Sequence, residues 1–151
     1  MVRKIYIAAD HAGFKLKQKL AAFLTKNNVK FTDLTPEFNE GDDYPDVAIP
    51  AALKTILNNG LCILVCGSGE GMCIAANKVT TARAAQIWNK ETAKRARSED
   101  DVNIACIGSR VTSEKQAKIA TLTFIQTPFI ATGKKKRYLR RIEKIEAFEN
   151  A

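Results

Sequence analysis

The sequence is poor in metal-binding side chains and has no long apolar run. It contains one histidine, His11, and no Cys-x-x-Cys pair, whereas zinc sites usually draw on paired cysteines or several histidines. No apolar stretch approaches the roughly 18 residues of a membrane-spanning helix. The loop Gly-x-x-x-x-Gly-Lys-Ser/Thr of P-loop nucleotide-binding proteins is also missing. We therefore expect no metal site, no membrane span and no nucleotide site of that type.

The remaining composition is that of an ordinary globular chain. Its 151 residues are 46% hydrophobic and 26% charged, which suits one domain, 1–151, with a real core. The first residues read directly as a strand with no signal peptide before them, so we expect a cytoplasmic protein.

The net charge of +8 is concentrated in a basic run at residues 134–141. Such a run can bind nucleic acid, phosphate or an acidic surface, or can be the solvated face of a helix. Nucleic acid is not favoured as a partner, because Tyr138 is the only aromatic residue within the run.

Apolar runs alternate with helical patterns along the chain. We predict strands at 4–9, 29–34, 61–66, 82–87 and 103–107. We predict helices at 14–27, 46–58, 71–79, 90–97, 113–126 and 137–149, with Pro50 causing a kink or a late start in the second. This alternation indicates an α/β protein, a Rossmann-like three-layer α/β/α sandwich around a five-stranded parallel sheet. If the first and third strands flank the switch point of the sheet, Asp10, His11 and Cys66 meet in one crevice.

The most informative stretch is the loop Cys66-Gly-Ser-Gly-Glu-Gly71. Alternate glycines let the backbone approach a ligand and point its N–H groups outward, and a helix start favours anions and thiolates. A dinucleotide fingerprint is excluded because the third glycine, Gly71, comes one residue early. A phosphatase-type cysteine loop is excluded because Met72 stands where its arginine is needed. The alternatives left are an anion-binding loop headed by a reactive cysteine, or a tight turn around a buried one.

Six motifs in order resemble one family. Residues 9–13, 43–45, 66–71, 75–78 and 108–110, together with the pair Arg137 and Arg141, are similar to those of type B ribose-5-phosphate isomerases, whose wider family includes allose- and galactose-6-phosphate isomerases. The resemblance covers almost the whole chain. It implies metal-free and cofactor-free isomerisation of a sugar phosphate through an enediolate in carbohydrate metabolism. It also implies a homodimer or tetramer whose sites draw on two chains.

The chemistry assigns candidate roles to residues of these motifs. Cys66 can move the proton between C2 and C1, and Ser68 can pass a proton between the sugar oxygens. The N–H groups of Gly67, Ser68, Gly69, Glu70 and Gly71 can form an anion hole. By resemblance, Asp10, His11, Tyr44 and Asp100 contact the substrate, and His11, Arg110, Arg137 and Arg141 bind its phosphate. Arg137 and Arg141 are four residues apart, so they share one face of a helix.

The chain departs from the family at two positions. Glu99 and Asp100 stand where family isomerases usually carry a His-Asn pair, whose histidine opens the furanose ring. Glu99 can replace that histidine as acid and base, the protein can act on the open-chain sugar, or a heteromeric partner can supply the histidine. In the galactose-6-phosphate isomerases of the family, the cysteine and histidine are divided between two kinds of chain.

Two classes of function therefore stay open. The first is an isomerase, with ribose 5-phosphate as the first substrate to test and allose or galactose 6-phosphate as alternatives. The second is a non-catalytic protein that binds a sugar phosphate. The retained Cys66 and the complete glycine loop favour the isomerase.

Overall fold

Three buried strands form the centre of the computed structural model, which describes residues 3–151. They are β1 (Ile5–Ala9), β3 (Leu61–Cys66) and β5 (Ile104–Gly108), and every residue in them is buried. The shorter β2 (Thr32–Asp33) and β4 (Ala84–Gln86) lie at the two edges. All pairs are parallel and the order is β2-β1-β3-β5-β4. The nearly continuous apolar runs are explained by helices on both faces of the sheet.

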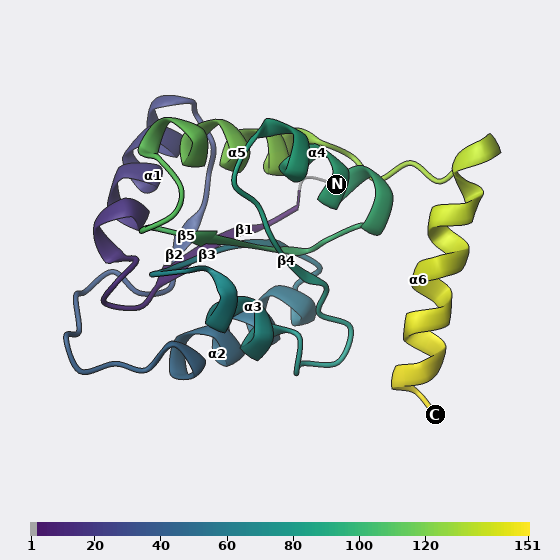
Figure 1. The fold of residues 1–151 in the computed structure, drawn as a ribbon, viewed down its shortest axis with the longest axis horizontal. Helices are drawn as coiled ribbons and strands as arrows, with labels where there is room; N and C mark the ends of the chain where they lie inside the picture. The colour runs from purple at the N-terminus through teal and green to yellow at the C-terminus, as the bar shows by residue number, and fades with distance from the viewer. Residues whose placement is uncertain (1–2) are drawn as a thin grey trace.

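Two helical layers cover the sheet, as Figure 1 shows. One face carries α1 (Phe14–Lys26), α4 (Lys90–Asp100) and α5 (Glu114–Gln126), and the other carries α2 (Tyr44–Leu57) and α3 (Glu70–Ala76). Each layer buries its own apolar cluster against alternate residues of the central strands. The predicted α/β class, the three layers and the five-stranded parallel sheet are confirmed.

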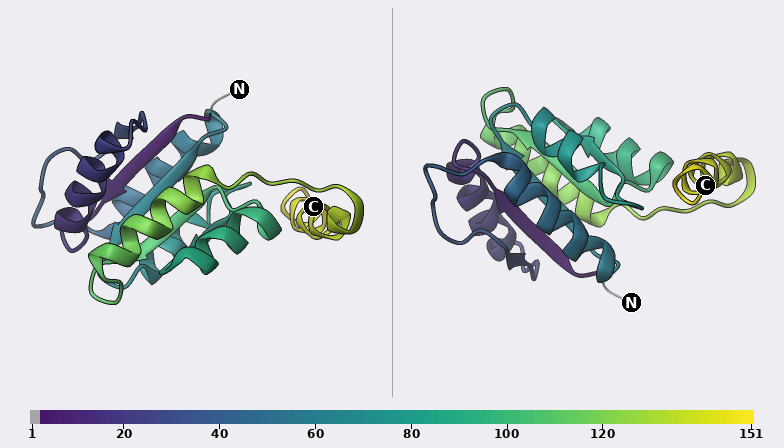
Figure 2. Two further views of the ribbon diagram at one scale, coloured as in Figure 1. Left: turned by 90° about the horizontal axis from the view of Figure 1, so that it is seen from above. Right: turned by 90° about the horizontal axis from the view of Figure 1, so that it is seen from below.

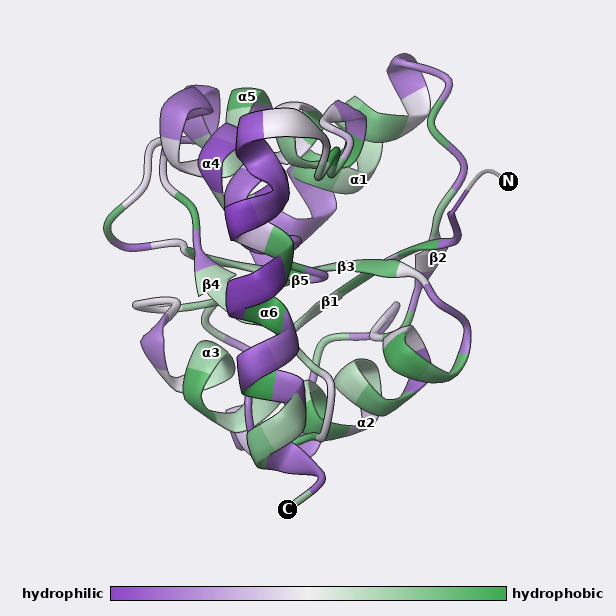
Figure 3. Ribbon diagram, turned by 90° about the vertical axis from the view of Figure 1, so that its right-hand side faces the viewer, coloured by the Kyte–Doolittle hydropathy of each residue, from purple (hydrophilic) through white to green (hydrophobic). Residues whose placement is uncertain are grey.

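The last helix stands apart from this sandwich. After α5 the chain runs through a short 3-10 turn (Gly133–Lys135) into α6 (Lys136–Glu149), which matches the predicted helix at 137–149. Both views of Figure 2 show α6 end-on beside the sandwich. Figure 3 looks at α6 from outside and shows hydrophobic segments along a largely hydrophilic ribbon in front of the sheet edge. Its apolar side is only partly covered, since Phe148 is 83% exposed.

Two helix boundaries that affect the candidate residues differ from the prediction. The second helix begins at Tyr44 rather than late, because Pro45 lies in the first turn, where an N–H group needs no helical partner. Pro50 lies inside that helix, where it removes one helical hydrogen bond, so the predicted late start is wrong and the kink stays a prediction. The fourth helix extends to Asp100, three residues beyond the prediction, and therefore carries Glu99 and Asp100. No helix within residues 3–151 combines the length and apolarity needed to cross a membrane.

The switch point of the sheet lies between β1 and β3, as predicted. The chain leaves β1 toward β2 on one side and returns to β3 on the other side. Ala9 is opposite Val65 in the register, and the Asp10 N–H donates to the Val65 carbonyl at 3.3 Å. Gly13 is equally close, since a Cβ built on it would lie 2.1 Å from that carbonyl oxygen. The loops that follow β1 and β3 therefore meet.

Candidate active site

Cys66 is the last residue of β3 and is held by the loop that follows it. Its side chain is 4% exposed, and its Sγ accepts a hydrogen bond from the Gly69 N–H at 3.1 Å. Gly69 has a φ of +83°, a left-handed conformation that favours glycine and turns the chain into α3. The Glu70 N–H donates to the Ser68 Oγ at 3.2 Å. Two of the five N–H groups predicted for an anion hole thus bind sulfur and oxygen within the loop itself.

Residues from β4 and from the turn after β5 hold the same loop in place. The Ser109 N–H donates to the Cys66 carbonyl at 2.8 Å, and the Arg110 N–H donates to the Gly67 carbonyl at 2.9 Å. The Arg110 guanidinium lies over Gly67, where an added Cβ would be 2.8 Å from Nη1. Gln86, which the sequence analysis missed, donates from Nε2 to the Ser68 carbonyl at 3.2 Å. Arg110 therefore lies beside the cysteine loop, and its assignment to the phosphate stays a prediction.

Asp10 and Tyr44 also lie close to the cysteine loop. Asp10 is 6% exposed, and its Oδ1 accepts from the Gly13 N–H at 2.9 Å, the turn-capping contact that a carboxylate at such a position favours. Tyr44 is the first residue of α2, and its ring lies on Gly71, where a Cβ would come within 2.8–2.9 Å of three ring atoms. Because Gly71 has no side chain, the Tyr44 ring lies directly against the cysteine loop.

His11 lies on the loop after β1 and has a hydrogen-bond partner that the sequence did not reveal. Asp42, from the loop before α2, accepts from the His11 N–H at 2.9 Å and contacts the ring Nδ1 at 2.8 Å, both through Oδ1. This hydrogen bond is the main cause of a raised His11 pKa, and the charges of Asp10 and Asp42 raise it further while desolvation lowers it. No sequence motif marks Asp42, because it is 31 residues away from His11 along the chain.

The other four predicted site residues lie away from Cys66 in the structure. Glu99 and Asp100 end α4 just before the amino end of β5, whereas Cys66 is level with Gly108 at the carboxyl end of β5. At about 3.3 Å per residue, the two ends of β5 are roughly 13 Å apart. Glu99 contacts Arg95 at 3.4 Å. Arg137 and Arg141 lie on α6, which Figure 1 shows at the end of the molecule opposite the β1–α1 loop.

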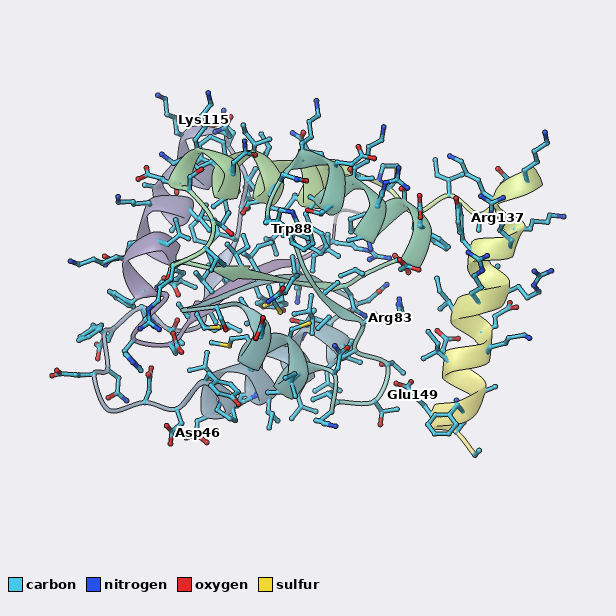
Figure 4. The ribbon with its side chains drawn as sticks, viewed as in Figure 1. Asp46, Arg83, Trp88, Lys115, Arg137 and Glu149 are labelled. Atoms are coloured by element: carbon cyan, nitrogen blue, oxygen red, sulfur yellow. The ribbon has the colours of Figure 1, made fainter. Side chains whose placement is uncertain are left out.

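Contacts with residues just before β4 hold α6 in place. Arg83 Nη1 lies 3.5 Å from Glu146 Oε1, and the Thr81 N–H donates to Glu149 Oε2 at 3.0 Å. Figure 4 shows Arg83 and Glu149 at this junction and Arg137 at the far end of the helix. The pKa of Asp100 is raised by burial and by Glu99, and the charge of Arg141 opposes this shift. Asp100 and Arg141 thus belong to one group, separate from Cys66.

Within residues 3–151 no group of three or more His, Cys, Asp or Glu side chains is arranged to hold a metal ion. A cavity of about 1130 Å³ lies at the amino ends of the strands, between Lys4, Phe31 and Phe129, away from Cys66. It contains none of the residues predicted for the site.

The fold and the loop together define a class of protein. A Rossmann-like sandwich with a cysteine-headed, glycine-rich loop at its switch point, beside an arginine and a buried carboxylate, is suited to binding a small anionic ligand.

Comparison with known proteins specifies the family. A model of the ribose/galactose isomerase family matches residues 5–145, and the chain belongs to this family. It is 40% identical to a probable ribose-5-phosphate isomerase B of Mycoplasma pneumoniae, over 99% of this chain and 97% of that protein. It is 36% identical to ribose-5-phosphate isomerase B of Mycobacterium tuberculosis, over 97% of this chain and 90% of that protein.

Solved structures agree with this assignment. Ribose-5-phosphate isomerase B of Mycoplasma genitalium with bound ribulose-5-phosphate superimposes with a TM-score of 0.90 at 37% identity, covering 99% of this chain and 98% of that one. The type B ribose 5-phosphate isomerase of Trypanosoma brucei gives a TM-score of 0.89 at 37% identity, covering 98% of this chain and 99% of that one. The expected family is therefore confirmed.

Proposed function

We propose that this protein is an aldose–ketose isomerase that interconverts ribose 5-phosphate and ribulose 5-phosphate. The observation that carries the proposal is the cysteine loop: the buried Cys66 thiol accepts from the Gly69 N–H, and Arg110 and the Tyr44 ring lie against Gly67 and Gly71 of the same loop. Membership of the ribose/galactose isomerase family supports the reaction, and the bound ribulose-5-phosphate of the Mycoplasma genitalium relative supports the substrate. The reaction belongs to carbohydrate metabolism in the cytoplasm, in a route such as the pentose phosphate pathway.

The proposed reaction transfers two protons within the substrate and exchanges no electrons with an outside reagent. The Cys66 thiolate removes the C2 proton of the open-chain aldose, the C1–C2 bond gains double-bond character, and negative charge develops on the C1 oxygen. Backbone N–H groups of Gly67, Ser68 and Gly71 stabilise that charge, and losing one such donor typically costs roughly 10²–10³ in rate. Ser68 passes the O2 proton to O1, and the Cys66 thiol returns its proton to C1 to give the ketose.

Asp10 and Tyr44 are the proposed sugar contacts of this chain. Asp10 keeps one carboxylate oxygen on the Gly13 N–H, so its second oxygen is left to accept a hydrogen bond from a sugar hydroxyl. The Tyr44 ring lies on Gly71, which brings its phenol oxygen to the edge of the cysteine loop. Together with Arg110 and His11, which we assign to the phosphate, they limit the site to a small phosphorylated polyol.

We further propose that a second copy of the chain completes the site. Arg137 and Arg141, the predicted phosphate ligands, lie on α6, and Glu99 and Asp100 lie beside it, so one chain cannot bring them to its own Cys66. The position of α6 beside the sandwich and its exposed Phe148 support its docking on a partner. In a homodimer the cysteine loop of one protomer meets α6 and the end of α4 of the other, with Glu99 in the position of the ring-opening histidine.

A substitution at Cys66 tests the reaction. Cys66→Ala should abolish exchange of the substrate C2 proton with deuterated solvent and leave the affinity for ribose 5-phosphate nearly unchanged. The matched control is Cys62→Ala, four residues earlier on the same strand and fully buried, which should lower stability more than rate. Exchange near the wild-type rate in Cys66→Ala would place the base elsewhere, with Glu70 as the next carboxylate to test.

A substrate panel separates the remaining alternatives. A coupled assay should show turnover of ribose 5-phosphate above that of allose and galactose 6-phosphates. Faster turnover of a hexose phosphate would reassign the substrate within the family. Binding of all three sugars without turnover of any would favour a non-catalytic sugar-phosphate-binding protein.

A further inference from the structure

Two loops at the carboxyl ends of β1 and β2 are connected to each other by hydrogen bonds at two separate points. One loop follows β1 and carries His11, and the other leads from β2 to α2 and carries Asp42. At the first tie the Ala9 N–H donates to Thr35 Oγ1 at 2.9 Å. At the second tie Asp42 Oδ1 accepts from the His11 N–H and faces the His11 Nδ1 at 2.8 Å. A carboxylate that engages both the backbone and the ring of one histidine leaves that ring little freedom.

A buried lysine fixes the start of the second loop. The Lys17 side chain is fully buried, and its Nζ lies 2.6 Å from Asp33 Oδ2 and 2.7 Å from the Thr35 carbonyl. The Thr35 N–H in turn donates to Asp33 Oδ1 at 3.0 Å. A buried charge is tolerated only with such partners, so this end of the loop is anchored to α1. Asp42 therefore approaches His11 from a supported loop.

We propose that Asp42 is a positioning residue for the substrate phosphate: it holds the His11 ring by Nδ1 and leaves Nε2–H as the cationic donor to the phosphate. The inference rests on the proposed function, in which His11 is a phosphate ligand. Since Nδ1 is engaged by Asp42, Nε2 is the ring nitrogen left for a ligand. An imidazolium binds a phosphate oxygen more strongly than a neutral ring does, because the hydrogen bond is then charge-assisted.

Two carboxylates favour the charged form of the His11 ring. Asp42 faces it from the β2–α2 loop and Asp10 from the β1–α1 loop, and both raise the His11 pKa above its usual value near 6.5. The raised pKa extends the protonated form to higher pH, toward neutral conditions. Removing the Asp42 charge should return the pKa toward 6.5, so that the phosphate contact weakens as pH rises.

The sole histidine makes this testable by NMR. In tag-free, ¹⁵N-labelled protein, His11 gives the only imidazole signals, so its pKa and tautomer are read directly. We expect Asp42→Asn to lower the pKa toward 6.5 and to remove the preference for a protonated Nδ1. Asp46→Asn, which changes an acidic residue in the first turn of α2, is the matched control and should titrate like the wild type. An unchanged titration in Asp42→Asn would overturn the proposal.

Kinetics separate positioning from a merely structural role. For Asp42→Asn, the KM for ribose 5-phosphate relative to wild type should rise about fivefold at pH 7.5, as expected for an exposed charge pair, with kcat little changed. The ratio should approach one at pH 5.5, where His11 is protonated in both proteins; titration of the substrate phosphate cancels in the ratio. His11→Gln should show the same loss, and the double variant should be no worse than His11→Gln alone. Additive losses, or a ratio independent of pH, would overturn the proposal.

Binding of inorganic phosphate tests the role of Asp42 independently of the isomerase reaction. If no sugar phosphate is turned over, inorganic phosphate serves as the probe and the His11 signals are the readout. Phosphate should shift them in wild type and Asp46→Asn at pH 7.5, and the shift should require higher phosphate concentrations in Asp42→Asn. Equal phosphate affinity in all three proteins would refute the role of Asp42 whatever the reaction proves to be.

Discussion

Replacing Gly71 by alanine should displace the Tyr44 ring and leave the cysteine loop intact. A Cβ at residue 71 would lie 2.8 Å from Tyr44 Cζ and 2.9 Å from Cε1 and Cε2, closer than real Cβ atoms approach other heavy atoms. Gly71 lies within α3, so alanine fits its backbone and keeps its N–H group. The ring must therefore move, and it can, because Tyr44 is 40% exposed at the start of α2.

Two effects on stability should largely cancel. Glycine inside a helix is less stable than alanine by about 0.5–1 kcal/mol, so the change by itself favours folding. Loss of the ring contact opposes it by about 1 kcal/mol, the usual scale for burying one CH₂ group. We expect the free energy of unfolding in urea to stay within about 1 kcal/mol of the wild type. Gly69→Ala should cost far more, because residue 69 has a φ of +83° and a Cβ there would lie 2.9 Å from the Gly108 nitrogen.

The effect on catalysis should be much larger than the effect on stability. Displacing a substrate-positioning group by about 1 Å can cost about 10²-fold in rate, and we expect kcat/KM for ribose 5-phosphate to fall by that order. In a Tyr44→Ala background the clash is absent, so Gly71→Ala should stabilise the protein by about 0.5–1 kcal/mol and cause no further loss of kcat/KM. Full activity in Gly71→Ala would refute the assignment of Tyr44 to the sugar. Equal losses in both backgrounds would show that alanine damages the loop itself.

Three further predictions concern the residues on α4 and α6 that lie away from Cys66, and the buried Cys62. Arg137→Ala should raise the KM for ribose 5-phosphate about tenfold, the scale of a charge-assisted hydrogen bond, while Lys135→Ala stays within about twofold; equal effects would mean a diffuse basic surface. Glu99→His combined with Asp100→Asn should speed turnover of cyclic ribose 5-phosphate about tenfold, because histidine is both acid and base near neutral pH. The gain should be smaller on a sugar that cannot cyclise. No gain in the double variant, together with no loss in Glu99→Ala, would exclude a role of Glu99 in ring opening. Burial raises the pKa of Cys62 to about 12, so iodoacetamide at pH 8 should label it only in unfolded protein; labelling of folded protein, detected by mass spectrometry, would contradict its burial.

Much of the fold was predictable because it follows from local pattern. Continuous apolar runs such as 61–66 reflect strands covered on both faces, and their alternation with helices leads to a parallel sheet through right-handed crossovers. The cysteine loop was found because its glycines and cysteine are adjacent in sequence. The edge strand predicted at 29–34 is only Thr32–Asp33, because beyond it the Ala9 N–H of β1 donates to the Thr35 side chain instead of a backbone carbonyl.

Pairs that are distant along the chain could not be predicted. Asp42 and His11, and Lys17 with Asp33, meet only because β1 and β2 are neighbours and bring their loops together. Gln86 reaches the Ser68 carbonyl because β4 lies beyond β5, an order that hydrophobic periodicity does not encode.

The sequence alone determined the class of fold, the family and the identity of the cysteine loop, since each depends on residue types at short, fixed spacings. The tertiary structure decided how the candidate residues are divided. It placed Tyr44 and Arg110 against the cysteine loop, and Asp10 and His11 on the β1–α1 loop, whose Gly13 packs on the end of β3. It placed Glu99 and Arg137 at the other end of the molecule, because α4 ends at the amino edge of the sheet and α6 leaves the sandwich there. Element order by itself puts the end of α4 at the amino end of β5, because a helix that joins parallel strands must return there. No strand follows α6, so only packing contacts such as that between Arg83 and Glu146 fix its position.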